Sequence, residues 1–123
     1  MVKVAFCDDS EIQLALIKAR LAEYTKRKGV EFDLSYYSDG EDLLKGAEEK
    51  GGFDLYILDI VLHGKKGTEI AAALRAREDF GYILFYTGTE AFSQVVDELK
   101  PCLYFIKTKP ADDFYQILDQ IFS

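Results

Sequence analysis

The chain has 123 residues, of which 49% are hydrophobic and 14% aromatic, enough apolar material for one core in one domain. Its 22 Asp and Glu residues outnumber its 15 Lys and Arg residues, so the formal net charge is −7. This composition argues against disorder, and the negative charge, which repels phosphate backbones, argues against direct binding of DNA or RNA.

The first half of the chain alternates strand-like and helix-like segments. The apolar run Val2–Cys7 predicts a strand, and the capping-box pattern that begins at Ser10 predicts a helix over Glu11–Lys28. Alternating apolar and polar residues over 32–36 indicate a second strand near the sheet edge, and a helix from Gly40 to about residue 50 follows it.

The second half repeats this alternation. The nearly all-apolar run 53–58 is typical of a central parallel strand covered on both faces, and a glycine-containing loop over 60–67 follows it. The remaining predicted elements are a helix over 68–77, a strand over 82–86, a weaker helix over 90–99, a strand over 102–106 and a helix over 111–122.

Five strand–helix repeats of this kind predict the fold class. Because strand-to-strand crossovers are almost always right-handed, the repeats wind into a doubly wound α/β fold, a five-stranded parallel sheet with helices on both faces. Neither a linker nor a low-complexity stretch interrupts the chain, so residues 1–123 are predicted to form one compact domain.

The cysteines and the length of the apolar runs bear on location. Cys7 and Cys102 lie in apolar strand-like runs, which favours small core side chains in a reduced, cytosolic protein. No apolar run approaches the roughly 20 residues that span a bilayer, and the N-terminus enters a strand rather than a signal peptide. We therefore expect a soluble, cytoplasmic protein.

Polar side chains follow four of the predicted strands, at the point where each strand ends. Asp8 and Asp9 follow the first strand, Asp59 the third, Thr87 the fourth and Lys107 the fifth. Because the carboxyl ends of parallel strands share one edge of the sheet, we expect these side chains to converge on one crevice. Three acids, a hydroxyl and a lysine together indicate a site for a hard cation and a phosphoryl group.

The order of these residues and the motifs around them resemble the receiver domain of response regulators from bacterial two-component systems (CheY-like), across the whole chain. The matching motifs lie at residues 7–11, at 58–62 with Gly67 eight residues after Asp59, at 86–88 and at 104–107. The segment 59–67 and the aromatic run 85–87 look most like receivers attached to LytTR-type transcriptional regulators.

The resemblance implies a flavodoxin-like (βα)5 sheet with strand order 2-1-3-4-5 and a phosphoacceptor switch. Asp59 would take a phosphoryl group from a phosphohistidine of a sensor histidine kinase. Mg²⁺, held by Asp8, Asp9, Asp59 and the backbone carbonyl of Val61, would offset the repulsion between the carboxylate and the phosphoryl group. Loss of Asp9 or Asp59 is expected to weaken metal binding more than loss of Asp8.

The resemblance also implies how the switch would work. Lys107 and the Thr87 hydroxyl would bind phosphoryl oxygens, Thr87 would move toward them, and Tyr104 would swing inward. The surface over residues 90–122 would change, serve as a face for a homodimer, and control an output, with transcription as the expected one. No output domain and no membrane contact are expected in this chain, nor any enzymatic activity beyond its own phosphorylation and autodephosphorylation.

Two positions depart from the family pattern. Receivers usually carry Lys-Pro after the last strand, whereas here Lys107 precedes Thr108 and the Lys-Pro pair begins at Lys109. We favour Lys107 for the pocket because Tyr104 then lies three residues before it, and we expect Lys109 to be a solvated loop charge. His63, where receivers often have proline, is expected to be a surface loop residue.

Other functions remain open at this point. A receiver-like interaction module that does not use phosphorylation would keep the same residues. A flavodoxin-like or dinucleotide-binding enzyme with the same fold is disfavoured, because Asp8 and Asp9 stand where such an enzyme has a glycine-rich turn that cradles phosphate. An aspartate phosphohydrolase is disfavoured because Val61 stands where such enzymes need a second acid.

Overall fold

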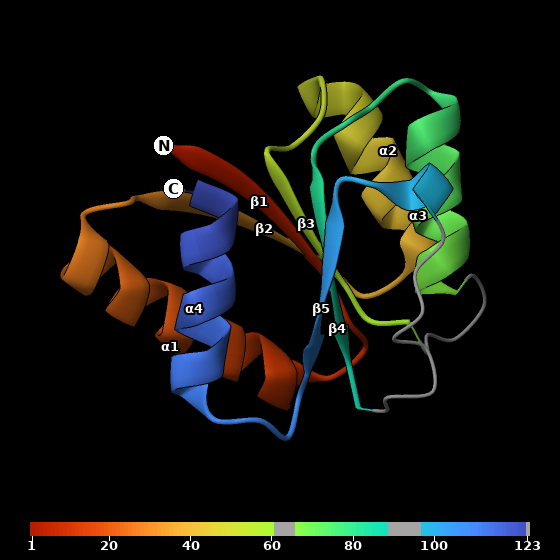
Figure 1. The fold of residues 1–123 in the computed structure, drawn as a ribbon. Coiled ribbons are helices and arrows are strands. Elements are labelled where there is room, and N and C mark those ends of the chain that lie inside the picture. The colour runs from red at the N-terminus through yellow and green to blue at the C-terminus, as the bar shows by residue number, and fades with distance from the viewer. Residues whose placement is uncertain (61–65, 89–96, 123) are drawn as a thin grey trace.

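The computed structural model describes residues 1–60, 66–88 and 97–122. Five parallel strands form a single sheet in the order β2-β1-β3-β4-β5, with α1 and α4 covering one face and α2 and α3 the other (Figure 1). The predicted doubly wound α/β class and the strand order 2-1-3-4-5 are therefore confirmed.

The strands match the predicted positions closely. Their bounds are Val2–Cys7 for β1, Phe32–Tyr37 for β2, Leu55–Leu58 for β3, Tyr82–Thr87 for β4 and Cys102–Ile106 for β5. The third strand begins two residues later than predicted. The Phe53 N–H donates to the Tyr56 hydroxyl instead of to a neighbouring strand, whereas the Asp54 backbone still bonds to Lys3 and Tyr82 on either side.

The helices flank the sheet as expected. They span Glu11–Lys28 for α1, Gly40–Lys50 for α2, Gly67–Ala76 for α3 and Ala111–Phe122 for α4. Most of the weaker helix predicted over 90–99 lies outside the described residues, and its described end, Asp97–Leu99, is a short 3-10 turn, η2.

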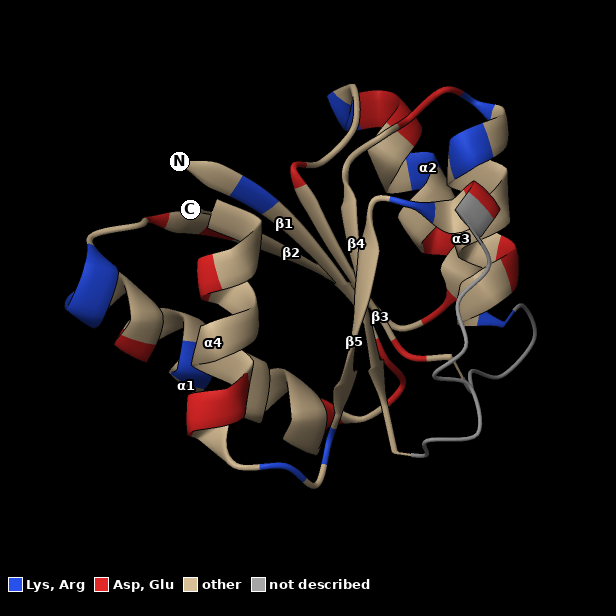
Figure 2. Cartoon of the chain, in the orientation of Figure 1, with Lys and Arg blue, Asp and Glu red and all other residues tan. Residues whose placement is uncertain are grey.

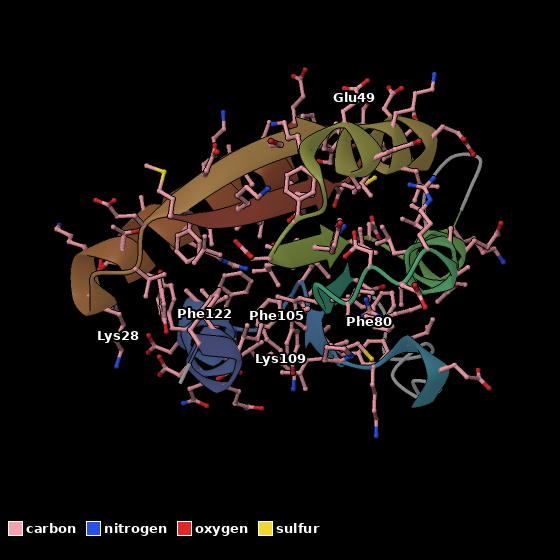
Figure 3. The ribbon with its side chains drawn as sticks, turned by 90° about the horizontal axis from the view of Figure 1, so that it is seen from above. Lys28, Glu49, Phe80, Phe105, Lys109 and Phe122 are labelled. Carbon is pink, nitrogen blue, oxygen red and sulfur yellow. The ribbon has the colours of Figure 1, made fainter. Side chains whose placement is uncertain are left out.

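The core is divided by the sheet into two apolar layers. Along β3, Leu55 and Ile57 face the α1 and α4 side, whereas Tyr56 and Leu58 face the α2 and α3 side. All four side chains are fully buried, which is why this strand is apolar on both faces. Seen from above, Lys28 and Lys109 point outward from the molecule (Figure 3).

Helix α1 begins and ends where the sequence predicts, although its capping box is only half formed. The Ser10 hydroxyl accepts from the Gln13 N–H at 3.3 Å, and Gly29 ends the helix with φ 75°. The Ser10 N–H, however, donates to Asp8 Oδ1, and the Gln13 side-chain oxygen accepts from the Tyr86 hydroxyl. The first turn of α1 is therefore bonded to residues outside the helix.

Cys7 is fully buried, whereas Cys102 is half-buried. Burial raises the pKa of the Cys7 thiol to about 12, with further upward contributions from the carboxylates of Asp39 and Asp8. Within the described residues, no helix is long and apolar enough to cross a membrane.

Cys7 should resist alkylation in the folded protein. Because its pKa is raised, the folded state favours the neutral thiol; this contribution to stability is complete below the unfolded pKa near 9 and is lost as the pH rises toward 12. Iodoacetamide at pH 8, followed by peptide mass spectrometry, should modify Cys7 only after unfolding in guanidinium. Modification of Cys7 in the native protein at the rate seen for the unfolded chain would contradict this prediction.

Candidate functional site

Three carboxylates meet at one edge of the sheet. Strands β1 and β3 are neighbours, with Cys7 paired to Leu58, so the residues that follow them lie side by side. Each of Asp8, Asp9 and Asp59 offers one oxygen, and these atoms all lie within 4.8 Å of one another. Figure 2 shows these acidic segments beyond the carboxyl ends of β1 and β3.

One lysine neutralises two of these acids. Lys107 follows β5, and its Nζ donates to Asp8 Oδ2 and to Asp59 Oδ2, each at 2.8 Å. The Lys107 side chain is 15% exposed, against 1% for Asp8 and 9% for Asp59. Lys109 is exposed, so the lysine that contacts the carboxylates is Lys107.

Burial and charge pairing act in opposite directions on these groups. Burial raises the pKa of Asp8, and the hydrogen bond from Lys107 offsets part of that rise. Burial alone would lower the pKa of Lys107, but its hydrogen bonds to Asp59 and Asp8 outweigh this and raise it. The ammonium is therefore charged at neutral pH and holds the acids together.

Asp8 is held by three hydrogen bonds to residues other than Asp9 and Asp59. Its Oδ1 accepts from the Ser10 N–H at 3.0 Å and its Oδ2 from Lys107, while its backbone oxygen accepts from the Tyr36 hydroxyl at 2.6 Å. The Tyr36 contact was missed by the sequence reasoning, which treated this tyrosine only as an apolar residue of β2. Asp9, by contrast, is exposed.

Thr87 ends β4 beside the cluster with its hydroxyl unused. Its side chain is fully buried, and Oγ1 has no hydrogen-bond partner among the described residues. A buried hydroxyl without a partner costs free energy, and such groups in native structures often serve a ligand. The backbone of Thr87 is bonded to the residue after β5, because the Lys107 N–H donates to the Thr87 carbonyl at 2.8 Å.

The donor set fits a hard divalent cation. Carboxylate oxygens are the ligands that Mg²⁺ prefers, and three of them lie close enough to face one ion. Val61, whose carbonyl was predicted as a further ligand, and His63 both lie outside the described residues.

Tyr104, the residue predicted to switch, is half-buried in β5. Its ring stacks on Phe85 of β4, with the ring centroids 5.2 Å apart and an interplanar angle of 29°. This places it on the same face of the sheet as α3, two residues before Ile106 and three before Lys107.

Tyr86 is a second residue that the sequence reasoning did not single out. It lies directly before Thr87, and the Lys107 Nζ sits 5.4 Å from the centroid of its ring. The signal in the sequence is a tyrosine, with its polar hydroxyl, at a position of β4 where a purely apolar side chain would satisfy the core.

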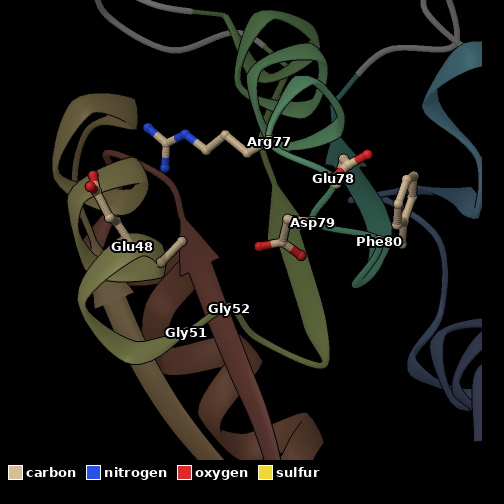
Figure 4. A pocket seen from close by; sticks show the side chains of 8 residues that line it. Glu48, Gly51, Gly52, Arg77, Glu78, Asp79 and Phe80 are labelled. Atoms are coloured by element: carbon tan, nitrogen blue, oxygen red, sulfur yellow. The ribbon is translucent and has the colours of Figure 1, made fainter.

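A separate cavity of about 560 Å³ lies at the other end of the sheet, and none of its lining residues belongs to the carboxylate cluster. Arg77 reaches across it from α3 toward α2, and its guanidinium donates to the Leu44 carbonyl (Figure 4). Asp79 in this cavity already accepts from the Tyr56 hydroxyl and the Gly81 N–H, so its oxygens are used internally.

The family model described as "Response regulator receiver domain" matches residues 4–120. No curated protein matches the chain.

Many solved structures resemble this one. Response regulator protein TrrA from Thermotoga maritima, in complex with Mg²⁺–BeF, is 24% identical over 98% of this chain and 99% of its own, with a TM-score of 0.80. Chemotaxis protein CheY4 from Vibrio cholerae is 21% identical over 98% of both chains, with a TM-score of 0.75. A LuxR-family DNA-binding response regulator from Staphylococcus aureus is 18% identical over 100% of both chains, with a TM-score of 0.77. At these identities the likeness shows a shared fold.

Gly67 should be intolerant of a side chain because it lies against the backbone that carries Asp59. A Cβ at Gly67 would collide with the Asp59 carbonyl and crowd the Ile60 Cα, whereas a Cβ at the exposed Gly88 meets no described atom within 4 Å. Gly67→Ala should lower the free energy of unfolding by about 1–3 kcal/mol in urea titrations, and Gly88→Ala should leave it nearly unchanged. Equal stabilities of the two variants would contradict this account of the loop.

Mg²⁺ should stabilise the fold through the acidic cluster. At ten times its Kd, a ligand that binds only the folded state adds about 1.4 kcal/mol to the free energy of unfolding. The rise in Tm with Mg²⁺ should be lost in Asp9→Asn and kept in Asp33→Asn, a matched change at an exposed acid of β2. An equal rise in Tm in both variants would mean that Mg²⁺ binds at another site.

Proposed function

The chain belongs to the response regulator receiver domain family, and from this premise we propose that it is a phosphoacceptor switch of a two-component phosphorelay, with Asp59 as the acceptor. The observation that carries the proposal is the set of groups around one carboxylate. Two further acids, an ammonium and a buried hydroxyl without a described partner all lie at the sheet edge where Asp59 ends β3.

Asp59 is the nucleophile in this proposal. One of its oxygens forms a bond to the phosphorus of a phosphohistidine on a sensor histidine kinase, the P–N bond breaks, and the imidazole leaves with that electron pair. The product is an acyl phosphate on Asp59. The chain turns over no independent substrate, so it is a switch with slow autodephosphorylation rather than an enzyme.

Asp8, Asp9 and Asp59 are the residues that would hold Mg²⁺, together with the Val61 carbonyl outside the described residues. The ion supplies positive charge that offsets the repulsion between the phosphoryl oxygens and the carboxylates. Asp8 has both carboxylate oxygens engaged, by Ser10 and Lys107, which limits how it can bind an ion directly. This supports a smaller loss of metal binding from removing Asp8 than from removing Asp9 or Asp59.

Lys107 and Thr87 would bind the phosphoryl oxygens. The Lys107 Nζ already lies 2.8 Å from Asp59 Oδ2, so its ammonium is close enough to bind an oxygen of a phosphoryl group attached to Asp59. The Thr87 hydroxyl gains in the phosphorylated state a partner that no described residue provides now. Both contacts favour one state over the other, which is what a population shift requires.

The output side of the switch follows from the position of β5. A shift of Thr87 would disturb the stacking of the neighbouring Phe85 on Tyr104, and Tyr104 would turn inward. The surface over residues 90–122, of which 97–122 are described, would then change and serve as a dimer or effector face. We take residues 1–123 as the receiver unit of a cytoplasmic regulator of transcription; its likeness to LytTR-type regulators stays a prediction.

Phosphoryl uptake tests this proposal directly. Incubation with Mg²⁺ and acetyl phosphate, read by intact-mass spectrometry, should add one phosphoryl group to the wild type and none to Asp59→Asn. Lys107→Ala should slow uptake by about tenfold, the equivalent of losing one charge-assisted hydrogen bond worth ~1.5 kcal/mol, and the exposed Lys109→Ala should not.

No added mass in the wild type, or addition undiminished in Asp59→Asn, would overturn the proposal. That result would favour the alternative of a receiver-like interaction module that does not use phosphorylation.

A further inference from the structure

Tyr86 lies beneath the pocket lysine and is buried on every side. Its exposed fraction is 0%, and the Lys107 Nζ stands 5.4 Å from the centroid of its ring. The two acids hold the ammonium from one side at 2.8 Å each, and the aromatic face lies within cation–π range of the same nitrogen.

The hydroxyl of Tyr86 is anchored on helix α1. It donates to Gln13 Oε1 at 2.8 Å and accepts from Arg20 Nη1 at 3.2 Å. Arg20 is itself held in place, because its guanidinium carbon lies 5.5 Å from the ring centroids of both Phe105 and Phe114. The hydroxyl thus has two partners whose positions are set by other contacts.

The ring of Tyr86 is fixed by three other aromatic rings. Phe105 stacks on it at 5.7 Å with an interplanar angle of 8°, while Phe6 and Phe114 meet it at 78° and 81°. A ring packed in this way and bonded at its tip cannot turn without breaking several contacts.

We propose that Tyr86 is a positioning residue for Lys107: its ring holds the ammonium over the Asp8 and Asp59 carboxylates, and its hydroxyl bonds to α1 fix the ring. This inference rests on the proposed phosphoacceptor function. Lysine is a point charge on a flexible stem, so a site that needs its ammonium at one place must restrict it by contacts. Packing alone would be satisfied by an apolar residue here, and the paired hydroxyl is the feature that packing leaves unexplained.

A double-mutant cycle tests whether Tyr86 acts through Lys107. Tyr86→Leu should slow phosphoryl uptake from acetyl phosphate by about three- to fivefold, the size of a modest cation–π contact, and should have no further effect in a Lys107→Ala background. Tyr56→Leu is the matched control, since Tyr56 is an equally buried tyrosine with a hydrogen-bonded hydroxyl, and it lies in the other apolar layer of the core. Its effect should be the same in both backgrounds. An equal slowing by Tyr86→Leu with and without Lys107 would overturn the proposal.

NMR of the Lys107 side chain gives a readout that does not depend on phosphorylation. The ring current of Tyr86 should displace the Lys107 methylene and ammonium proton shifts, and this displacement should vanish in Tyr86→Leu and persist in Tyr56→Leu. Tyr86→Phe, which keeps the ring and loses the hydroxyl, should reduce the displacement only in part. Unchanged Lys107 shifts in Tyr86→Leu would overturn the proposal.

These two measurements separate the possible failures. If the wild type takes up no phosphoryl group, the proposed function fails while the NMR comparison still decides whether Tyr86 positions the lysine. If Tyr86→Leu does not fold, Tyr86→Met, whose flexible side chain fills more of the space, carries the same comparison.

Discussion

The structure depends on one ammonium group between two carboxylates. Asp8 and Asp59 lie within 4.8 Å of each other, and at an effective dielectric constant of about 20 such charges repel by about 3 kcal/mol. The Lys107 Nζ lies 2.8 Å from an oxygen of each carboxylate, so the summed electrostatic interaction of the three charged groups becomes attractive. Without a cation in this place the carboxyl ends of β1 and β3 would push apart, so the same acids that suit the site to a metal also require a resident positive charge.

The doubly wound sheet explains why these groups can meet although they are far apart in the sequence. Asp8 and Lys107 are separated by 99 positions, yet both follow strands whose carboxyl ends share an edge. The arrangement carries local costs. The Thr87 hydroxyl is buried without a described partner, and α3 must begin with a glycine so that it can lie against the Asp59 backbone. Both costs fall next to the Asp59 carboxylate, and such local costs tend to gather at functional sites.

Local signals in the sequence predicted most of the fold, and tertiary contacts account for what it missed. The ends of α1 and α4 were predicted correctly because helix caps and apolar spacing depend on residues close together in the sequence. The late start of β3 and the half-formed capping box involve the side-chain hydroxyls of Tyr56 and Tyr86, which local propensity does not predict. In the site, the order of the motifs predicted which residues meet, and the spacing to Tyr104 already favoured Lys107 over Lys109; the structure shows Lys107 in contact with the acids. The contacts of Tyr36 and Tyr86 were not predicted, because they join residues that no motif links.

A lysine that already pairs with the Asp59 carboxylate also constrains how the proposed switch could respond. In the proposed acyl phosphate, the carboxylate charge of Asp59 would be lost and negative charge would lie further out, on the phosphoryl oxygens. Lys107 would then keep Asp8 as a partner and gain a phosphoryl oxygen, so its side chain would have to extend from its present place over the Tyr86 ring. Because the Lys107 N–H is bonded to the Thr87 carbonyl, that extension and the proposed movement of Thr87 would act on one segment of backbone. The charge on Asp59 and the position of β4 relative to β5 would in this way be coupled through neighbouring atoms, with no long chain of contacts needed between them.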